Sequence, residues 1–155
     1  MNSIRETASR QYAGILNRAA RQAADLKAPP GGWISTMRKA LGMSAPALAR
    51  RLGVTKAAIY QAERKERDGG VTLRHMEHLA QAMGGRFVYA IVPEGQIEDT
   101  RRDQARTRAR AVVRRANAHM ALEQQALPPD RMQAEIERLT DQILRERPAD
   151  LWKAP

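Results

Sequence analysis

The side chains in this sequence that are best placed to do chemistry are cationic. Lysines and arginines number 27 against 17 aspartates and glutamates, which gives a formal net charge of +10 at pH 7. They are densest over residues 101–115. A surplus of this size in a small protein points to a polyanionic partner, most often a nucleic acid. The alternative is a surface that only keeps the protein in solution.

Covalent and metal chemistry find little support among the other side chains. The chain has no cysteine, which removes disulfides, cysteine-based zinc sites and thiol catalysis. His75 and His78 lie one turn apart on a predicted helix, but no carboxylate or cysteine completes a metal set. No Ser/His/Asp arrangement and no glycine-rich phosphate loop is present. We therefore expect neither an enzyme nor a bound cofactor or metal.

Four short helices predicted between residues 33 and 84 would position a binding surface. Prolines and glycines at 29–32 separate this region from the preceding chain. Ser44, Thr55 and Thr72 are suited to cap the second, third and fourth helices. Gly53 allows a tight corner between the second and third, and Ala49 lies where the two helices touch. The predicted helices span residues 33–41, 45–52, 56–65 and 73–83, and the expected inward anchors are Leu48, Leu52, Val54 and Ile59.

Residues 44–64 resemble the XRE/phage-repressor helix-turn-helix. They read Ser-Ala-Pro-Ala-Leu-Ala-Arg-Arg-Leu-Gly-Val-Thr-Lys-Ala-Ala-Ile-Tyr-Gln-Ala-Glu-Arg. The specific features are Leu-Ala-x-x-Leu-Gly-Val, then Ile59, then Glu63 four residues further on. The resemblance covers about residues 33–83, a third of the chain. It implies sequence-specific binding to double-stranded DNA, with the third helix of the region in the major groove.

The resemblance also implies roles for individual side chains. Gln61 would hydrogen-bond adenine, Lys56 would reach guanine and Ala57 would touch a thymine methyl group. Tyr60 completes this face, with packing as its alternative role, and Gln61 is alternatively only solvated. The expected base-contacting residues are Lys56, Ala57, Tyr60 and Gln61, and the expected phosphate-contacting residues are Ser44, Thr55, Arg64 and Lys65.

Three further positions qualify the resemblance. Glu63 is expected to be structural, pairing with Arg38, Arg50 or Arg51 inside the domain. Ala45 stands where the family pattern usually has a glutamine that touches phosphate, which puts that contact in doubt. Lys65 stands where a glycine is common, which suggests a longer third helix or a different exit loop.

The whole chain also resembles a narrower group, the mobile mystery protein A family. The features that carry this resemblance are the N-terminal arm, Gly32-Trp33-Ile34, the segment Arg-Phe-Val-Tyr-Ala-Ile-Val-Pro at 86–93 and the basic tail. It implies an antitoxin encoded beside a Fic-domain protein. The chain lacks the Fic signature of His-Pro-Phe followed by Gly-Asn. It also lacks the Ser/Thr-x-x-x-Glu-Gly/Asn motif of some Fic inhibitors.

The flanking segments predict a helical arm and a strand. Residues 3–27 form an amphipathic pattern that includes Ile4, Tyr12 and Ile15. Residues 86–92 are apolar on both alternating faces, as in a buried strand. A lone strand leaves its edges unpaired, so we expect it to pair with a second copy across a dimer. The alternatives are pairing inside the chain or packing on the helices as extended chain. The expected dimer-strand residues are Phe87, Tyr89 and Ile91.

Residues 97–155 predict a helical hairpin. A long helix over 97–127 is followed by Pro128 and Pro129 and a second helix that Asp130 can cap. The Arg-rich stretch over 101–115 could contact the DNA backbone, meet an acidic protein, or be solvated. Leu151 and Trp152 could form an exposed anchor. The expected apolar stripes are Ala105, Ala109, Val112, Ala116 and Met120 in the first helix and Met132, Ile136, Leu139 and Ile143 in the second.

These observations predict an all-α protein: a helix-turn-helix bundle with one short β-strand, an N-terminal helical arm and a C-terminal helical hairpin. The expected parts are the arm at 1–28, the DNA-binding domain at 33–84, the strand at 85–93 and the helical region at 97–155. We expect a cytoplasmic, homodimeric repressor that binds a palindromic operator and acts as the autorepressing antitoxin of a Fic-type toxin. The alternatives are an antitoxin that acts mainly by holding its toxin through the helical arms, and a mobile-element repressor without a toxin. No segment is long and apolar enough to suggest a membrane span or a secretory signal.

Overall fold

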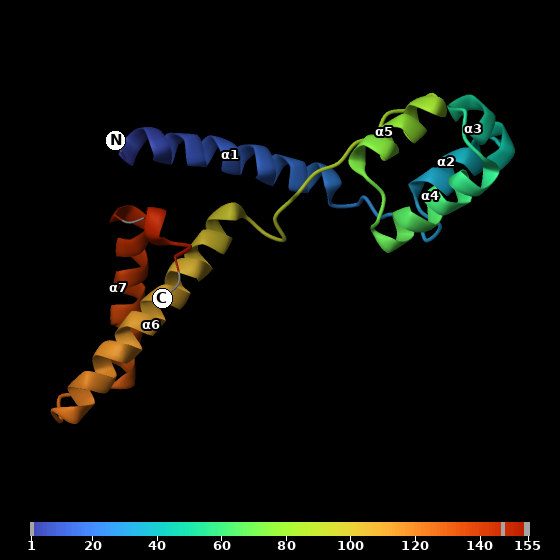
Figure 1. Cartoon of the computed structure of the whole chain (residues 1–155). Coiled ribbons are helices and arrows are strands. Elements are labelled where there is room, and N and C mark those ends of the chain that lie inside the picture. Colours follow the sequence, from blue (N-terminus) through green and yellow to red (C-terminus); the bar gives the residue numbers. More distant parts are fainter. Residues whose placement is uncertain (1, 147, 154–155) are drawn as a thin grey trace. The chain divides into compact units, whose positions relative to one another are not determined.

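A computed structural model describes residues 2–146 and 148–153 (Figure 1). The chain divides into two compact units, one over residues 23–90 and the other formed by 1–22 together with 91–155. The regular elements of the described chain are all helical, which confirms the all-α class. They are α1 (Asn2–Ala23), α2 (Trp33–Ala40), α3 (Ala45–Leu52), α4 (Lys56–Asp68), α5 (Leu73–Ala82), α6 (Ile97–Leu122), α7 (Pro129–Glu146) and the 3₁₀ turn η1 (Pro148–Asp150).

Helices α2 to α5 enclose the core of the unit at 23–90. Leu48 and Leu79 are fully buried, and Ile59 is 1% exposed. Leu52 packs at the edge of this core, as expected. Val54 is 42% exposed, so its expected role as an inward anchor is wrong. Its N–H donates to Ala49 O at 3.0 Å, and this bond fixes the corner backbone without burying the side chain.

Local capping fixes where these helices begin. The side chains of Ser44, Thr55 and Thr72 accept the N–H of Ala47, Ala58 and His75 at 3.2, 3.1 and 3.1 Å. Each satisfies an N–H that has no partner inside its helix. The three caps confirm the predicted starts. Helix α4 runs on to Asp68 and ends at Gly69, whose φ of 79° suits glycine, so the longer third helix suggested by Lys65 is confirmed.

The strand expected over residues 86–92 is wrong for the single chain, because no strand occurs among the described residues. A strand needs a partner edge, and this segment finds none within residues 2–146 and 148–153. Phe87 packs against the core of the unit at 23–90. Tyr89 stacks on Phe87 with ring centroids 5.9 Å apart. The alternative of an extended segment packed on helices therefore describes Phe87.

The hairpin of α6 and α7 forms the core of the second unit. Ala105, Ala109, Ile136 and Ile143 are buried there as predicted, but Val113 is buried and Val112 is 54% exposed. After Ala109, the predicted apolar stripe of α6 therefore no longer coincides with the buried face of the helix. Leu151 is 1% exposed and Trp152 is 64% exposed, so Leu151 belongs to the core and not to an exposed anchor.

Helix α6 also ends at Leu122, five residues before the predicted end at 127. Gln124 has a φ of 59°, and the N–H of Gln125 donates back to Met120 O at 2.8 Å. These features close the helix in the manner of a left-handed C-cap. Asn117 Oδ1 then accepts the N–H of Leu127 at 2.7 Å, which stabilises the turn toward α7.

Helix α1 packs through a face that hydropathy does not reveal. Ala13 and Asn17 are its buried residues. Asn17 Oδ1 accepts the N–H of Ile97, and its Nδ2 donates to Glu98, both at 3.1 Å. Asn17 thus satisfies the first N–H of α6, whose N-cap residue supplies no side-chain bond. The helix also ends at Ala23, four residues before the predicted end at 27.

None of the helices that the structure describes is long and apolar enough to cross a membrane.

Acidification should loosen the α6–α7 hairpin through Glu137. The hydrogen bond from Arg106 is the main cause that lowers the pKa of Glu137 below its ordinary 4.5. A lowered folded pKa gives stability that is complete above the unfolded pKa and is lost as pH falls through the folded pKa. Thermal melts by circular dichroism from pH 7 to pH 3 should show that Glu137→Gln removes part of the acid dependence. Glu123→Gln, at an exposed carboxylate, is the control and should leave it unchanged. Equal acid dependence in all three chains would contradict this role.

Candidate nucleic-acid interface

Helices α3 and α4 are joined by a corner of three residues. Gly53 ends α3 in the left-handed conformation, with φ 69° and ψ 32°. This conformation strains a residue that has a Cβ, which is why glycine suits the corner. Thr55 then caps α4. The corner therefore sets the direction of α4 within a few residues of the α3 core.

Helix α4 has a buried side and an exposed side. Ile59, Ala62 and Glu63 face inward and are 1%, 3% and 5% exposed. This spacing of three and four residues marks one helix face. The four residues predicted to contact bases are all solvent-exposed. They are Lys56, Ala57, Tyr60 and Gln61.

Tyr60 is 48% exposed. About half of its surface is therefore covered by the protein, and the rest is open to solvent.

The residues predicted to contact phosphate are also exposed. Arg64 and Lys65 follow Tyr60 and Gln61 by one turn and form no ion pair among the described residues. Ser44 and Thr55 lie at the N-termini of α3 and α4, but their side-chain oxygens are occupied as caps. What they can offer an anion is the backbone N–H groups of the first turn, which carry partial positive charge.

A buried ion pair holds α4 against α2. Arg38 Nε donates to Glu63 Oε1 at 2.7 Å, and the two side chains are 10% and 7% exposed. Arg38 Nη1 also donates to Met43 O at 3.1 Å. The prediction that Glu63 pairs inside the domain is confirmed, with Arg38 as its partner. Arg51, another predicted partner, instead donates to Ala82 O at 2.8 Å.

Glu66, which the sequence analysis missed, makes a second contact between α4 and α2. Its carboxylate accepts the N–H of Trp33 at 2.6 Å and of Ile34 at 3.0 Å. Gly32 has φ 83°, and a Cβ there would lie 2.8 Å from Glu66 Oε2. A negative charge at a helix N-terminus is favourable because it accepts unpaired N–H groups. The sequence feature that could have indicated this contact is Gly31–Gly32, because α2 begins there without a Ser, Thr, Asp or Asn cap and its first N–H groups need another acceptor.

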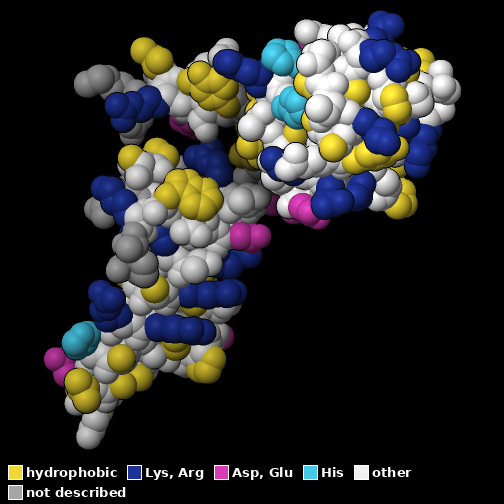
Figure 2. Space-filling view, turned by 45° about the vertical axis from the view of Figure 1, so that its right-hand side comes forward, with side chains coloured by type: hydrophobic (Ala, Val, Ile, Leu, Met, Phe, Trp, Pro, Cys, Tyr) yellow, Lys and Arg dark blue, Asp and Glu magenta, His cyan; other side chains and the backbone are white. Residues whose placement is uncertain are grey.

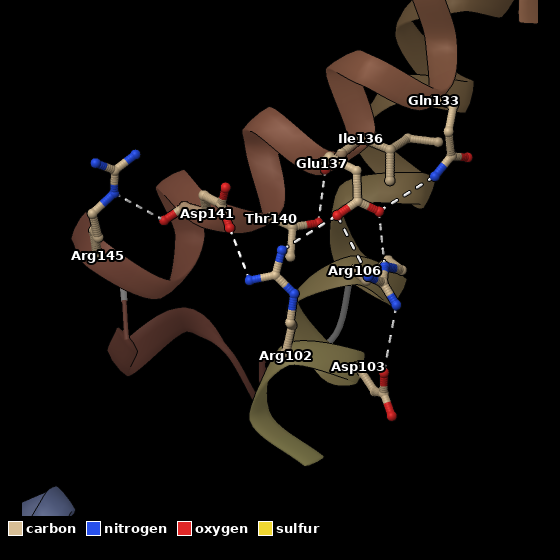
Figure 3. Close-up of polar contacts among 9 residues, drawn as sticks. All are labelled: Arg102, Asp103, Arg106, Gln133, Ile136, Glu137, Thr140, Asp141 and Arg145. Atoms are coloured by element: carbon tan, nitrogen blue, oxygen red, sulfur yellow. Dashed lines mark hydrogen bonds and ion pairs between the residues drawn. The ribbon is translucent and has the colours of Figure 1, made fainter. Parts of the chain in front are cut away.

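The arginines of residues 101–115 fall into three groups, of which Figure 3 shows the first, Arg102 and Arg106 with their acidic partners. Arg102 pairs with Asp141 at 2.9 Å and with Glu137 at 3.3 Å, and Arg106 pairs with Glu137 at 3.0 Å. The hydrogen bond that Arg102 donates to Asp141 is the main cause that raises the pKa of Arg102. These pairs join α6 to α7, so both arginines serve the hairpin.

Two other arginines contact their own unit, Arg101 through Ser9 at 3.4 Å and Arg108 through the carbonyl of Lys153. Arg110, Arg114 and Arg115 are exposed and make no hydrogen bond or ion pair that the described structure records. Figure 2 shows many cationic and few acidic side chains on the face that it presents. The free cationic surface of α6 is thus smaller than its arginine content suggests.

His75 and His78 are both exposed on α5. No group of three or more His, Cys, Asp or Glu suited to a metal ion occurs in the described part of the chain.

Comparisons of this chain with protein-family models, with curated proteins and with solved structures found no match. The resemblance to the XRE family therefore stays a prediction from residues 33–83.

Removing either partner of the buried pair should destabilise the unit at 23–90. Arg38→Met or Glu63→Leu alone leaves an unpaired buried charge, at a cost of about 3–5 kcal/mol. The double variant should cost clearly less than the sum of the two. Urea unfolding followed by Trp33 fluorescence, in a Trp152→Phe background, measures this unit alone. Arg67→Met, at an exposed arginine of α4, is the control and should change stability by less than about 0.5 kcal/mol. Strict additivity of the two single effects would show that the pair has no coupling.

Proposed function

We propose that this chain is a sequence-specific regulator that binds double-stranded DNA through a helix-turn-helix made of α3 and α4. The observation that carries the proposal is the exposed face of Lys56, Ala57, Tyr60 and Gln61 on a helix whose other face is fixed by Ile59 and the buried pair of Glu63. Helix α4 would enter the major groove while α3 crosses the backbone.

The exposed side chains of α4 differ in what they can recognise. Gln61 offers an acceptor and a donor, which matches the N7 and N6 edge of adenine. Lys56 is a donor suited to O6 and N7 of guanine, and Ala57 suits a thymine methyl group. Arg64 and Lys65 would contact phosphate, which fixes the register but carries no sequence information. The net charge of +10 supports the electrostatic part of binding.

We further propose that the protein acts as a homodimer on a palindromic operator. Proteins with this motif place two recognition helices about one DNA turn apart, so a twofold dimer matches a palindrome. Val88 and Tyr89, at the end of the unit at 23–90, are 71% and 67% exposed, which gives an apolar surface for a second copy. Its own promoter is the proposed target, by resemblance to antitoxin regulators.

A second candidate function is the antitoxin role, in which the protein holds a Fic-type toxin through its helical arms. The specific observation is an apolar stripe on α1. Ile4, Tyr12 and Ile15 are 76%, 67% and 60% exposed and lie on one helix face, away from buried Ala13 and Asn17. An apolar stripe on an exposed helix is the usual form of a helix that docks in a groove of another protein.

Replacing Lys56 and Gln61 by alanine should abolish most of the sequence preference of DNA binding. Each lost base contact costs about 1–3 kcal/mol of discrimination, so the preference should fall at least about tenfold. The measurement is fluorescence anisotropy with DNA from upstream of its own coding sequence and with a shuffled duplex, at near-physiological salt.

Arg114→Gln is the matched control for this experiment, because it also removes one positive charge, at an exposed residue of α6 outside the helix-turn-helix. It should weaken binding to both duplexes alike, if at all, and leave their ratio unchanged. Equal binding of the unmodified protein to both duplexes, fading as salt rises, would overturn the proposal of specific recognition.

The pair of changes Tyr12→Glu and Ile15→Glu should abolish toxin neutralisation without affecting DNA binding. Charges on the stripe cannot enter an apolar groove without losing their hydration. Co-expression with the protein of the adjacent gene measures protection from growth arrest, and anisotropy measures DNA affinity. Arg10→Gln with Arg21→Gln makes the same change in net charge on another face of α1 and should keep protection. Full protection by the Tyr12/Ile15 variant would rule out the stripe as the toxin surface.

A further inference from the structure

The unit at 23–90 contains an apolar cavity of about 330 Å³ next to α2 and α5. Much of its wall is formed by Trp33, Met37, Met76 and Met83. Phe87, from the segment after α5, also lines it. The cavity lies within one compact unit. Its size is near the lower end of small-molecule sites, roughly 300–1,000 Å³, and too small for a partner helix about 10–12 Å wide.

The chemistry of the wall limits what could occupy the cavity. Its side chains are apolar except that of Arg86, which is exposed and makes no ion pair among the described residues. Met37, Met76 and Met83 are flexible and polarisable, so they can adapt to ligands of different shape. An apolar body would fill the cavity, and one anionic group could reach Arg86.

We propose that this cavity binds a small molecule with an apolar body and a single carboxylate, and that its occupation weakens DNA binding. The second part rests on the proposed function. Trp33 and Ile34 line the cavity, and their backbone N–H groups are the ones that Glu66 of α4 accepts. A ligand that displaces Trp33 would disturb the contact that holds the C-terminal half of α4 against α2.

The occupant can be tested on the full chain without DNA. The protein has two tryptophans, so in a Trp152→Phe background the fluorescence of Trp33 reports on the cavity. Octanoate is the probe, and octanol tests the same chain length without the charge. Octanoate should give a saturable change, and octanol should bind about tenfold more weakly, because a charged hydrogen bond contributes about that much.

Two variants and one control make the binding test specific. Ala80→Met places a longer side chain in the wall of the cavity. It should abolish the change in Trp33 fluorescence on adding octanoate while its thermal melt remains cooperative. Arg86→Gln should reduce the affinity for octanoate to that for octanol. Arg74→Gln, at an exposed arginine of α5 outside the wall, should bind octanoate normally. Absence of a saturable change in the unmodified chain, or equal affinity for octanoate in Arg86→Gln, would overturn the proposed ligand class.

The effect on DNA is measured separately. Saturating octanoate should weaken operator binding by at least about fivefold, and operator DNA should weaken octanoate binding by the same factor, because coupling between two sites is reciprocal. Saturable octanoate binding with unchanged DNA affinity would overturn the regulatory part alone. Octanoate binding by a chain that shows no sequence preference for DNA would overturn the proposed function and leave the cavity site standing.

Discussion

The arrangement of the unit at 23–90 depends on the buried pair of Arg38 and Glu63. Two charges taken out of water must be paired, because each unpaired one would cost several kcal/mol, on the order of its lost hydration. Glu63 can meet Arg38 only when the inward face of α4 is turned toward α2, at a separation of 2.7 Å between the charged atoms. The pair thus selects one rotation of α4 about its axis, more sharply than the contacts of Ile59 and Ala62 would by themselves.

The charges of α4 are separated by this constraint. Its glutamates face α2, where Glu63 binds Arg38 and Glu66 binds two backbone N–H groups. Its exposed cations are Lys56, Arg64, Lys65 and Arg67. The helix therefore attaches to its own domain through its two glutamates and exposes its cations, with Asp68 exposed at its C-terminal end. This division of charge supports the proposal that α4 contacts an anionic partner.

The helix starts in the unit at 23–90 could be predicted because they depend on local sequence. Features that depend on contacts between distant residues could not be predicted in this way. The caps at Ser44, Thr55 and Thr72 act within three residues, so the starts of α3, α4 and α5 could be predicted. The strand over 86–92 needed a partner edge, which hydropathy does not supply. On the binding face, the exposure of Lys56 and Gln61 followed from helical spacing. Glu66 was missed because its partners are backbone N–H groups, which every residue type except proline carries.

The same limit applied to the flanking helices. Val112 and Val113 are both apolar, and only the packing of α7 decides that Val113 is buried. In α1 the most hydrophobic face was the obvious candidate for burial, yet Ala13 and Asn17 are buried and Ile15 is exposed. Small size and a hydrogen bond to the start of α6 outweighed hydrophobicity there.

The arginines of α6 show why a charge count does not measure a binding surface. Arg102 and Arg106 are one turn apart, and so are the acids opposite them on α7, Asp141 and Glu137. Continued along the antiparallel hairpin, this register places Gln133 opposite Arg110, and Gln133 carries no charge that could pair with it. Arg110 is accordingly exposed and forms no ion pair among the described residues. For Arg102, Arg106 and Arg110, the residue opposite each arginine on α7 therefore decides whether it holds the hairpin or remains exposed, and the number of arginines along α6 does not.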